Sequence, residues 1–374
     1  MNYIYIDTQS QLDQYIESAL SASVVAIDTE FVRTRTYYAQ LGLVQIFDGK
    51  QLALVDTVAI HDSSSLATLL AAPNVLKVLH ACSEDIEVFQ NDYGVMPTPM
   101  IDTQHMAAFL GEGISMGFAA AVSKYLGVEL DKSESRADWT ARPLSQKQLN
   151  YAAADVHYLL PLYHKLVDAL SATPWTEAAK QEALLLAKKR SATRSDDVAY
   201  LDIKGAWQLN PSQLMTLKLL AKWRKQTGLK RNLALNFVFK EADLLTVAMH
   251  QLTSFAAMEK QDIDQRSLQR YAKVIGQLVS ESLQIPEAQH PERVERLMDK
   301  PGYKALFKQL KDAVKDAANK SQLPPEMIAS KKQINQLINW HWKHNKDVNK
   351  TPDVMQYWRK SLIGDTLDKM MSNA

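Results

Sequence analysis

The first half of the chain alternates between apolar runs typical of strands and apolar spacings typical of helices. Short β-branched and apolar runs predict strands at residues 3–6, 24–31, 41–47, 51–55 and 75–80. Apolar residues three and four apart predict helices at residues 9–21, 83–93, 104–110, 117–126, 146–170 and 174–190. We therefore expect an α/β domain with a mixed sheet flanked by helices. Within it, 41–47 and 51–55 should form a hairpin with a two-residue loop at Asp48-Gly49 or Gly49-Lys50.

The second half follows a polar stretch at 191–197 and contains almost no strand pattern. The predicted helices are 211–227, 241–249, 264–283, 291–298, 301–319, 325–342 and 351–371. A shift of 90 residues aligns apolar positions of this half with one another, for example Leu220 with Leu310 and Leu244 with Ile334. Amphipathic helices can also match by accident, but the shift favours two related helical modules.

The composition is that of a globular protein with several domains. The 374 residues are 46% hydrophobic and 23% charged, which excludes disorder as the main state. No apolar run approaches the ~20 residues that cross a bilayer, and Met1–Asp7 does not begin a secretory signal. The one cysteine, Cys82, excludes an internal disulfide framework and a cysteine-cluster zinc site. We expect a cytoplasmic protein without a membrane segment.

Charge is divided unevenly along the chain. Residues 1–190 carry 22 acidic and 14 basic side chains, whereas residues 191–374 carry 20 acidic and 29 basic ones. This asymmetry indicates that the first half needs carboxylates and that the second half contacts an anionic partner, unless it is chance surface composition.

Asp28 and Glu30 interrupt a predicted apolar strand. Because side chains alternate along a strand, both carboxylates project from the same face. Their repulsion and lost hydration are costs that a divalent cation removes. In the structural alternative, each carboxylate caps a turn or pairs with Arg33 or Arg35.

Tyr151 and Asp155 form a second candidate pair. Their spacing of four places the phenol and the carboxylate on one helix face, with only alanines between them to obstruct a substrate. The alternative is a tyrosine packed in the core beside a solvated aspartate.

A third candidate is Asp85, where the strand ending at His80 runs into a helix. From the first turn of that helix Asp85 can reach a metal ion, or it can simply favour the helix dipole behind an N-cap at Ser83. His80, His157 and Cys82 form no set of nucleophile, base and orienting residue typical of a cysteine or serine hydrolase, and no zinc-protease motif or glycine-rich phosphate loop is present.

Together these segments resemble the three exonuclease motifs of the DEDD superfamily of 3′→5′ exonucleases. The tyrosine four residues before the last aspartate resembles the DEDDy branch. The sequence around these motifs resembles the bacterial ribonuclease D family over most of residues 1–170. The segments that carry this resemblance are 28–38, 41–43, 131–136, 138–139, 142–144 and 151–160. The basic half resembles two HRDC modules of the same family, at 220–224 and 232–237 in the first and at 330–337 and 340–342 in the second.

The resemblance implies a ribonuclease H-like mixed sheet followed by two all-α HRDC modules. The implied domains are a catalytic domain at 1–190, a linker at 191–207, a first HRDC module at 208–290 and a second at 291–374. The implied activity is metal-dependent exoribonuclease hydrolysis from the RNA 3′ end, which releases 5′-mononucleotides. The implied substrates are transfer RNA precursors. We expect a monomer that needs no protein partner.

The resemblance also implies the roles of the candidate residues. Two divalent ions, Mg²⁺ or Mn²⁺, would be bridged by Asp28, with Glu30 and Asp155 at the first ion and Asp85 at the second. Tyr151 would orient the attacking water.

Basic residues of the second half are candidate RNA contacts, with Trp223, Trp340 or Trp342 available for stacking. The candidates are Lys222, Arg224, Lys225, Lys230, Arg231, Lys331, Lys332 and Lys343. The alternative is that the tryptophans belong to the core and the cations to a solvated surface.

Two rival functions stay open at this point. A DNA exonuclease uses the same four acids, although no polymerase or helicase motif accompanies them here. A non-catalytic nucleic-acid adaptor is disfavoured by the complete set of acids.

Overall fold

The computed structural model describes residues 1–131, 133–191 and 195–372. Two compact units divide the chain: the first contains residues 1–32, 40–192 and 301–374, and the second contains residues 33–39 and 193–300. Lys132 of one family-like segment, residues 192–194 of the predicted linker and residues 373–374 of the second predicted module lie outside the described residues.

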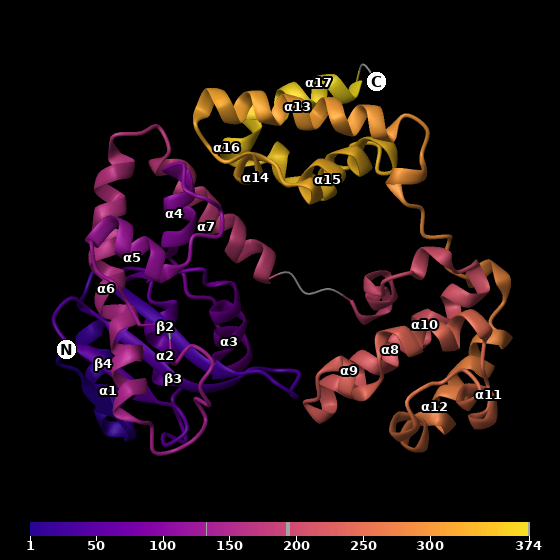
Figure 1. The fold of residues 1–374 in the computed structure, drawn as a ribbon, viewed down its shortest axis with the longest axis horizontal. Coiled ribbons are helices and arrows are strands. Elements are labelled where there is room, and N and C mark those ends of the chain that lie inside the picture. Colours follow the sequence, from indigo (N-terminus) through magenta and orange to yellow (C-terminus); the bar gives the residue numbers. More distant parts are fainter. Residues whose placement is uncertain (132, 192–194, 373–374) are drawn as a thin grey trace. The chain divides into compact units, whose positions relative to one another are not determined.

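The first unit is built on a mixed sheet of six strands in the order β1-β4-β3-β2-β5-β6. Figure 1 labels β2, β3 and β4 of this sheet. The strands are β1 (Ile4–Ile6), β2 (Val24–Val32), β3 (Gln40–Phe47), β4 (Leu52–Asp56), β5 (Leu76–Leu79) and β6 (Met100–Asp102). Strands β2, β3 and β4 pair antiparallel, whereas β1 runs parallel to β4, β5 to β2 and β6 to β5. The predicted mixed sheet is confirmed, and β2, the strand of Asp28 and Glu30, lies inside it.

The turn between β3 and β4 is longer than predicted. Phe47 faces Leu52, so residues 48–51 connect the strands rather than a two-residue loop. The Asp48 carboxylate accepts hydrogen bonds from the backbone N–H groups of Lys50 and Gln51, at 2.8 and 2.7 Å. This side chain therefore stabilises a wider turn than the hairpin rule anticipates.

Helices cover both faces of the sheet. Helices α1 (Gln9–Ala19), α2 (Ser65–Ala71) and α3 (Ser83–Tyr93) share one apolar core with one sheet face. Helix α6 (Gln146–Ser171) packs along β2, β3 and β4 on the other face, where His157 meets Phe47. The remaining helices before residue 192 are α4 (Thr103–Phe109), α5 (Phe118–Leu126) and α7 (Thr176–Ser191). Neither α2 nor the short β6 was predicted, because each is too brief to establish a periodic pattern.

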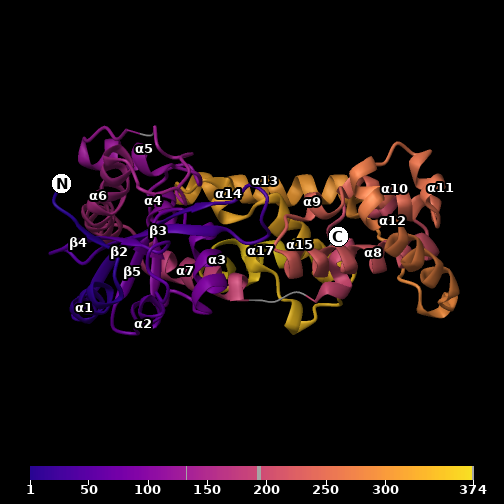
Figure 2. The same ribbon diagram turned by 90° about the horizontal axis from the view of Figure 1, so that it is seen from below.

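The second unit is an all-helical bundle, visible in both views (Figures 1 and 2). Its α-helices are α8 (Pro211–Arg231), α9 (Leu235–Val238), α10 (Glu241–His250), α11 (Phe255–Glu259) and α12 (Gln265–Gln284). Residues 33–39 join this bundle: the N–H of Ala234 donates to the carbonyl of Arg35 at 2.8 Å, and the N–H of Tyr38 donates to Asn232 Oδ1 at 3.0 Å.

The C-terminal helices belong to the first unit. They are α13 (Tyr303–Ser321), α14 (Pro325–Ile328), α15 (Lys331–Trp342), α16 (Tyr357–Arg359) and α17 (Asp365–Ser372). Helix α16 packs on α7, where the buried Arg359 forms an ion pair with Glu182 at 2.5 Å and donates to the carbonyl of Met327 at 2.9 Å. Among all described residues, no helix is both long and apolar enough to cross a membrane.

Three predicted helices of the second half are wrong in extent. Residues 291–298 form no α-helix, and only Leu297–Asp299 makes a 3₁₀ turn with no buried residue. Residues 325–342 form two helices, because Ser330 caps the second one at its N-terminus. Residues 351–371 are broken into a 3₁₀ turn, α16, a π-helical turn at Lys360–Gly364 and α17.

The predicted internal repeat agrees with the positions of the helices. The short helices α9 and α14 lie 90 residues apart, as do the buried pairs Leu220 and Leu310, and Leu244 and Ile334. Both predicted helical modules therefore contain a long helix, a short helix and a third helix in the same order: α8, α9 and α10 in the first, and α13, α14 and α15 in the second.

Candidate active site

Strand β2 presents Asp28 and Glu30 on the sheet face that α6 covers. Side chains alternate along the strand, so Thr29 between them points to the opposite face. The pairing of β2 with β3 shifts register between Glu30 and Phe31, immediately after the second carboxylate. Such irregularities re-aim side chains and are common beside active sites.

Helix α6 brings Asp155 to the same place. Candidate ligand oxygens of Asp28, Glu30 and Asp155 all lie within 4.8 Å of one another. The buried Ala152 and Ala153 let the helix approach the sheet closely. The fold therefore brings these three acids from β2 and α6 together.

Asp85, in the first turn of α3, is close enough for its charge to act on Asp28 and Glu30, but its carboxylate is not among the three that lie within 4.8 Å of one another. It is buried, and the Thr29 hydroxyl donates a hydrogen bond to its carboxylate. Asp102 shapes the preceding turn by accepting from the N–H groups of Ala81 and Cys82, at 2.9 and 3.2 Å. Cys82, not Ser83, is the N-cap residue of α3, so the structural alternative of a cap at Ser83 does not apply.

Burial and mutual repulsion disfavour charge on these acids. Burial, followed by repulsion from Asp85, Asp155 and Glu30, raises the pKa of Asp28 well above its usual range. Burial, followed by repulsion from Asp155 and Asp85, raises the pKa of Glu30 to about 9. Burial raises the pKa values of Asp85 and Asp155 to about 6 and about 7. An oxygen-only set of this kind suits a hard divalent cation, which would remove the repulsion.

The Tyr151 phenol lies near enough to the same acids for their charges to act on it. Burial, with repulsion from Asp155, Glu30 and Asp28, raises its pKa, so the hydroxyl keeps its proton and can donate a hydrogen bond. Its ring lies beside Trp139, with centroids 6.0 Å apart. Tyr151 is only half-buried, unlike a tyrosine that serves the core alone.

The loop before α6 supports Tyr151 through Trp139, which is 1% exposed. Arg142 donates to both Asp56 carboxylate oxygens at 2.6 and 2.7 Å, to the Gly42 carbonyl at 2.6 Å and to the Trp139 carbonyl at 2.9 Å. A side chain at position 42 would overlap that Trp139 carbonyl. These contacts explain structurally why Trp139 and Arg142, in the family-like segments 138–139 and 142–144, stand next to the site.

Sequence reasoning missed Thr29 and Asp102. Thr29 stands on the strand face away from the acid pair, and Asp102 follows a strand that was not predicted. The polar residue inside the apolar 24–31 run was the available signal for Thr29. Nothing in the local pattern of Asp102 identifies its acceptor role.

The candidate RNA contacts have different surroundings. Lys222 and Lys225 are paired with Asp197 and Asp196, at 2.8 and 2.7 Å. Arg224 is only 5% exposed and donates to the Phe239 carbonyl at 3.3 Å, which gives it a structural setting. The exposed candidates are Lys230, Arg231, Lys331, Lys332 and Lys343.

The tryptophans proposed for stacking make protein contacts. Trp223 packs against Tyr271 at 5.2 Å between centroids, and the buried Trp340 donates its ring N–H to the Asp347 carbonyl at 2.8 Å. Trp342 is half-buried.

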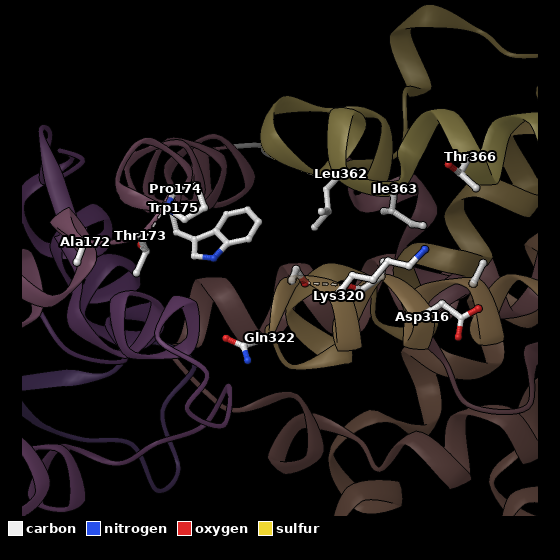
Figure 3. Close-up of a pocket in the computed structure, with 13 residues that line it drawn as sticks. Ala172, Thr173, Pro174, Trp175, Asp316, Lys320, Gln322, Leu362, Ile363 and Thr366 are labelled. Atoms are coloured by element: carbon white, nitrogen blue, oxygen red, sulfur yellow. Dashed lines mark hydrogen bonds between the residues drawn. The ribbon is translucent and has the colours of Figure 1, made fainter.

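A cavity of about 710 Å³ lies elsewhere in the first unit (Figure 3). The turn at Ala172–Trp175, the end of α13 and Leu362–Ile363 line it. None of the four clustered acids takes part, so this hollow is separate from the candidate active site.

Comparisons with known proteins agree with this geometry. Residues 3–171 match the 3′-5′ exonuclease family, residues 213–279 the HRDC domain family, and residues 301–367 the family described as ribonuclease D, C-terminal HRDC domain. The chain is 46% identical to ribonuclease D of Serratia proteamaculans and 44% identical to that of Escherichia coli K12, with 99% of each chain covered.

Solved structures show the same likeness. The crystal structure of Escherichia coli RNase D, described as an exoribonuclease involved in structured RNA processing, matches with a TM-score of 0.96 at 43% identity, over 100% of this chain and 99% of that one. The catalytic core of RRP6 from Trypanosoma brucei matches with a TM-score of 0.60 at 25% identity, over 75% of this chain and 79% of that one.

Proposed function

The chain belongs to the ribonuclease D family of 3′→5′ exoribonucleases, and from this premise we propose that it removes 5′-mononucleotides from RNA 3′ ends with two divalent ions. The observation that carries the proposal is the convergence of Asp28, Glu30 and Asp155 within 4.8 Å, with Asp85 beside them.

Asp28, Glu30, Asp85 and Asp155 would hold the two ions, Mg²⁺ or Mn²⁺. When bound, the ions supply a nucleophilic water near neutral pH and positive charge opposite the phosphate and the departing 3′ oxygen. The acids fit such ions because they are buried, oxygen-only and mutually repelling without one.

The chain's own residues orient the reaction. Tyr151 keeps its proton and donates a hydrogen bond that aims the attacking water at the scissile phosphorus. The Thr29 hydroxyl donates a hydrogen bond to the Asp85 carboxylate and so fixes its orientation. Trp139 and Arg142 fix the loop that backs Tyr151.

The finer parts of the proposal concern substrates and setting. We propose that the substrates are transfer RNA precursors and that the protein is monomeric and cytoplasmic. We also propose that the exposed cations of the second half contact RNA. The proposed domains are residues 1–190, 191–207, 208–290 and 291–374.

The test uses 5′-labelled RNA and DNA of matched sequence, incubated with Mg²⁺, Mn²⁺ or a chelator. We expect a ladder that shortens from the 3′ end on RNA and disappears with the chelator. Asp28→Ala should abolish the ladder while the protein stays folded by circular dichroism. Wild-type degradation by this variant would reject the assigned site, and degradation of DNA alone would favour the rival DNA exonuclease.

A further inference from the structure

We propose that a groove on the helical bundle of the second unit binds single-stranded RNA, an inference that rests on the proposed function. The groove has a volume of about 680 Å³ and lies between the start of α10 and the start of α12. Phe237, Lys240, Arg266 and Arg270 line it together with Glu241 and Asp264.

The cations of this groove are available to an anionic ligand. Lys240, Arg266 and Arg270 are exposed, and none of them forms an ion pair within 4 Å with another described residue. The two acids are held by protein donors. Glu241 accepts from the N–H of Lys204 at 3.0 Å, and Asp264 caps α12 by accepting from Ser267 at 3.0 Å.

Phe237 adds an aromatic platform. Its side chain is 52% exposed, and the guanidinium of Arg35 lies 5.9 Å from its ring centroid. An exposed ring flanked by unpaired cations is the combination that holds single strands, because bases stack on the ring while the cations follow the phosphates. An acidic protein segment would pair with the cations, whereas the exposed part of the ring also offers a base a stacking surface.

The lysines of α8 provide a matched contrast. Lys222 and Lys225 already contact Asp197 and Asp196, so a phosphate would have to displace a carboxylate from each. We therefore expect the groove, and not this helix face, to carry the affinity of the second unit for RNA.

The experiment measures binding of a 5′-fluorescent single-stranded oligoribonucleotide to the full chain by anisotropy, with EDTA present to prevent hydrolysis. Lys240→Gln/Arg266→Gln/Arg270→Gln should weaken binding and lower the slope of log affinity against log salt by about 2, at ~0.7 per phosphate contact. Phe237→Ala should weaken binding about tenfold with an unchanged slope. The control, Lys222→Gln/Lys225→Gln, should leave affinity and slope unchanged.

The outcome separates this proposal from the proposed function. The groove proposal is wrong if the triple variant binds RNA like the wild type while the wild type still produces a 3′ ladder. The groove would then be a candidate site for an acidic protein segment. Loss of the ladder in the wild type itself would instead reject the proposed function. With Mg²⁺ present, the triple variant should raise KM for the oligonucleotide and leave kcat unchanged.

A different observation points to Gln45 as a positioning residue for Asp28. Gln45 on β3 is paired directly with Asp28 on β2, so both side chains project from the same sheet face. It is 0% exposed, yet neither its amide nitrogen nor its amide oxygen has a hydrogen-bond partner among the residues that the structure describes. Buried amides almost always have partners, and those without one mark strain or an absent ligand.

The neighbouring carboxylate supplies the missing partner. We assign to the Gln45 amide the task of donating to the Asp28 carboxylate, directly or through one water, in protein whose acids would hold divalent ions. Outer partners of this kind orient metal ligands, and their removal typically costs 10–100-fold in metal affinity.

The test for Gln45 is Mn²⁺ titration by calorimetry together with thermal unfolding of chelated protein. Gln45→Leu should raise the metal-free Tm, because an unpaired buried amide is removed, and lower Mn²⁺ affinity by about 10–100-fold. The control, Val44→Ala, lies on the opposite face and should lower Tm with unchanged Mn²⁺ affinity. Wild-type Mn²⁺ affinity in Gln45→Leu would overturn the assignment, and Gln45→Met repeats the test if that variant does not fold.

Discussion

The clustered carboxylates set the pH dependence of the metal-free protein. Their pKa values in the fold, about 6 for Asp85, about 7 for Asp155 and about 9 for Glu30, lie above the ordinary values near 4. The fold therefore favours their protonated forms. This contribution to stability is complete in acid and is lost as pH rises through these folded-state values.

A first prediction follows for chelated protein. Its Tm should decline between pH 5 and pH 9, and millimolar Mg²⁺ should raise Tm more at pH 8 than at pH 5, because metal and protons compete for the same oxygens. Differential scanning fluorimetry across this range is the measurement. Asp28→Asn should flatten the decline, and an equally steep decline in that variant would contradict this origin.

Tyr151 permits a second prediction at the scale of one atom. Tyr151→Phe removes the hydroxyl and keeps the ring against Trp139, so folding and Mn²⁺ binding should stay as in the wild type. Single-turnover hydrolysis should slow by about 10²-fold, the usual size of a lost positioned proton donor. An unchanged rate would mean that Tyr151 only packs.

Helix α6 carries two active-site side chains, so its N-terminus matters for catalysis. Ser145 and Gln148 form a reciprocal capping box, with bonds of 3.1 and 2.9 Å. Ser145→Ala should lower the free energy of unfolding by about 1 kcal/mol and reduce kcat, because Tyr151 lies near this end. Ser254→Ala removes the cap of α11 in the other unit and should reduce stability without changing kcat. If Ser145→Ala and Ser254→Ala have the same kcat, the cap of α6 does not influence the chemical step and the prediction is wrong.

Elements with strong periodicity were predictable from the sequence, whereas features set by tertiary contact were not. The alternation in β2 correctly placed Asp28 and Glu30 on one face, and the spacing of four correctly placed Tyr151 and Asp155 on one helix. The contact of Thr29 with Asp85 joins elements far apart in the chain, which no local pattern encodes.

The misjudged helices have physical causes. The break at Ser330 had a local signal, since a serine followed three residues later by Gln333 is a capping box that restarts a helix. Residues 291–298 failed for another reason. A segment this short with no buried residue lacks the tertiary packing that isolated helices need.

At the scale of the whole molecule, the C-terminal helices depend on a buried ion pair. Arg359→Met leaves Glu182 charged and without its main partner, which should cost about 3–5 kcal/mol and loosen α16 from α7. Urea unfolding and protease sensitivity after residue 301 measure the effect. Glu182→Gln/Arg359→Met should recover much of the loss, because no uncompensated charge remains. A double variant as unstable as the single one would contradict this account.

The environment of Cys82 makes the chain convenient for spectroscopy. Its thiol is fully buried, and burial with the nearby Asp102 and Asp85 raises its pKa well above the usual range. Maleimide dyes attack thiolates, so the native side chain should stay unmodified under mild labelling. One cysteine introduced on the surface of each unit could then carry a donor and an acceptor fluorophore, and energy transfer would test whether the distance between the two dyes changes during RNA degradation.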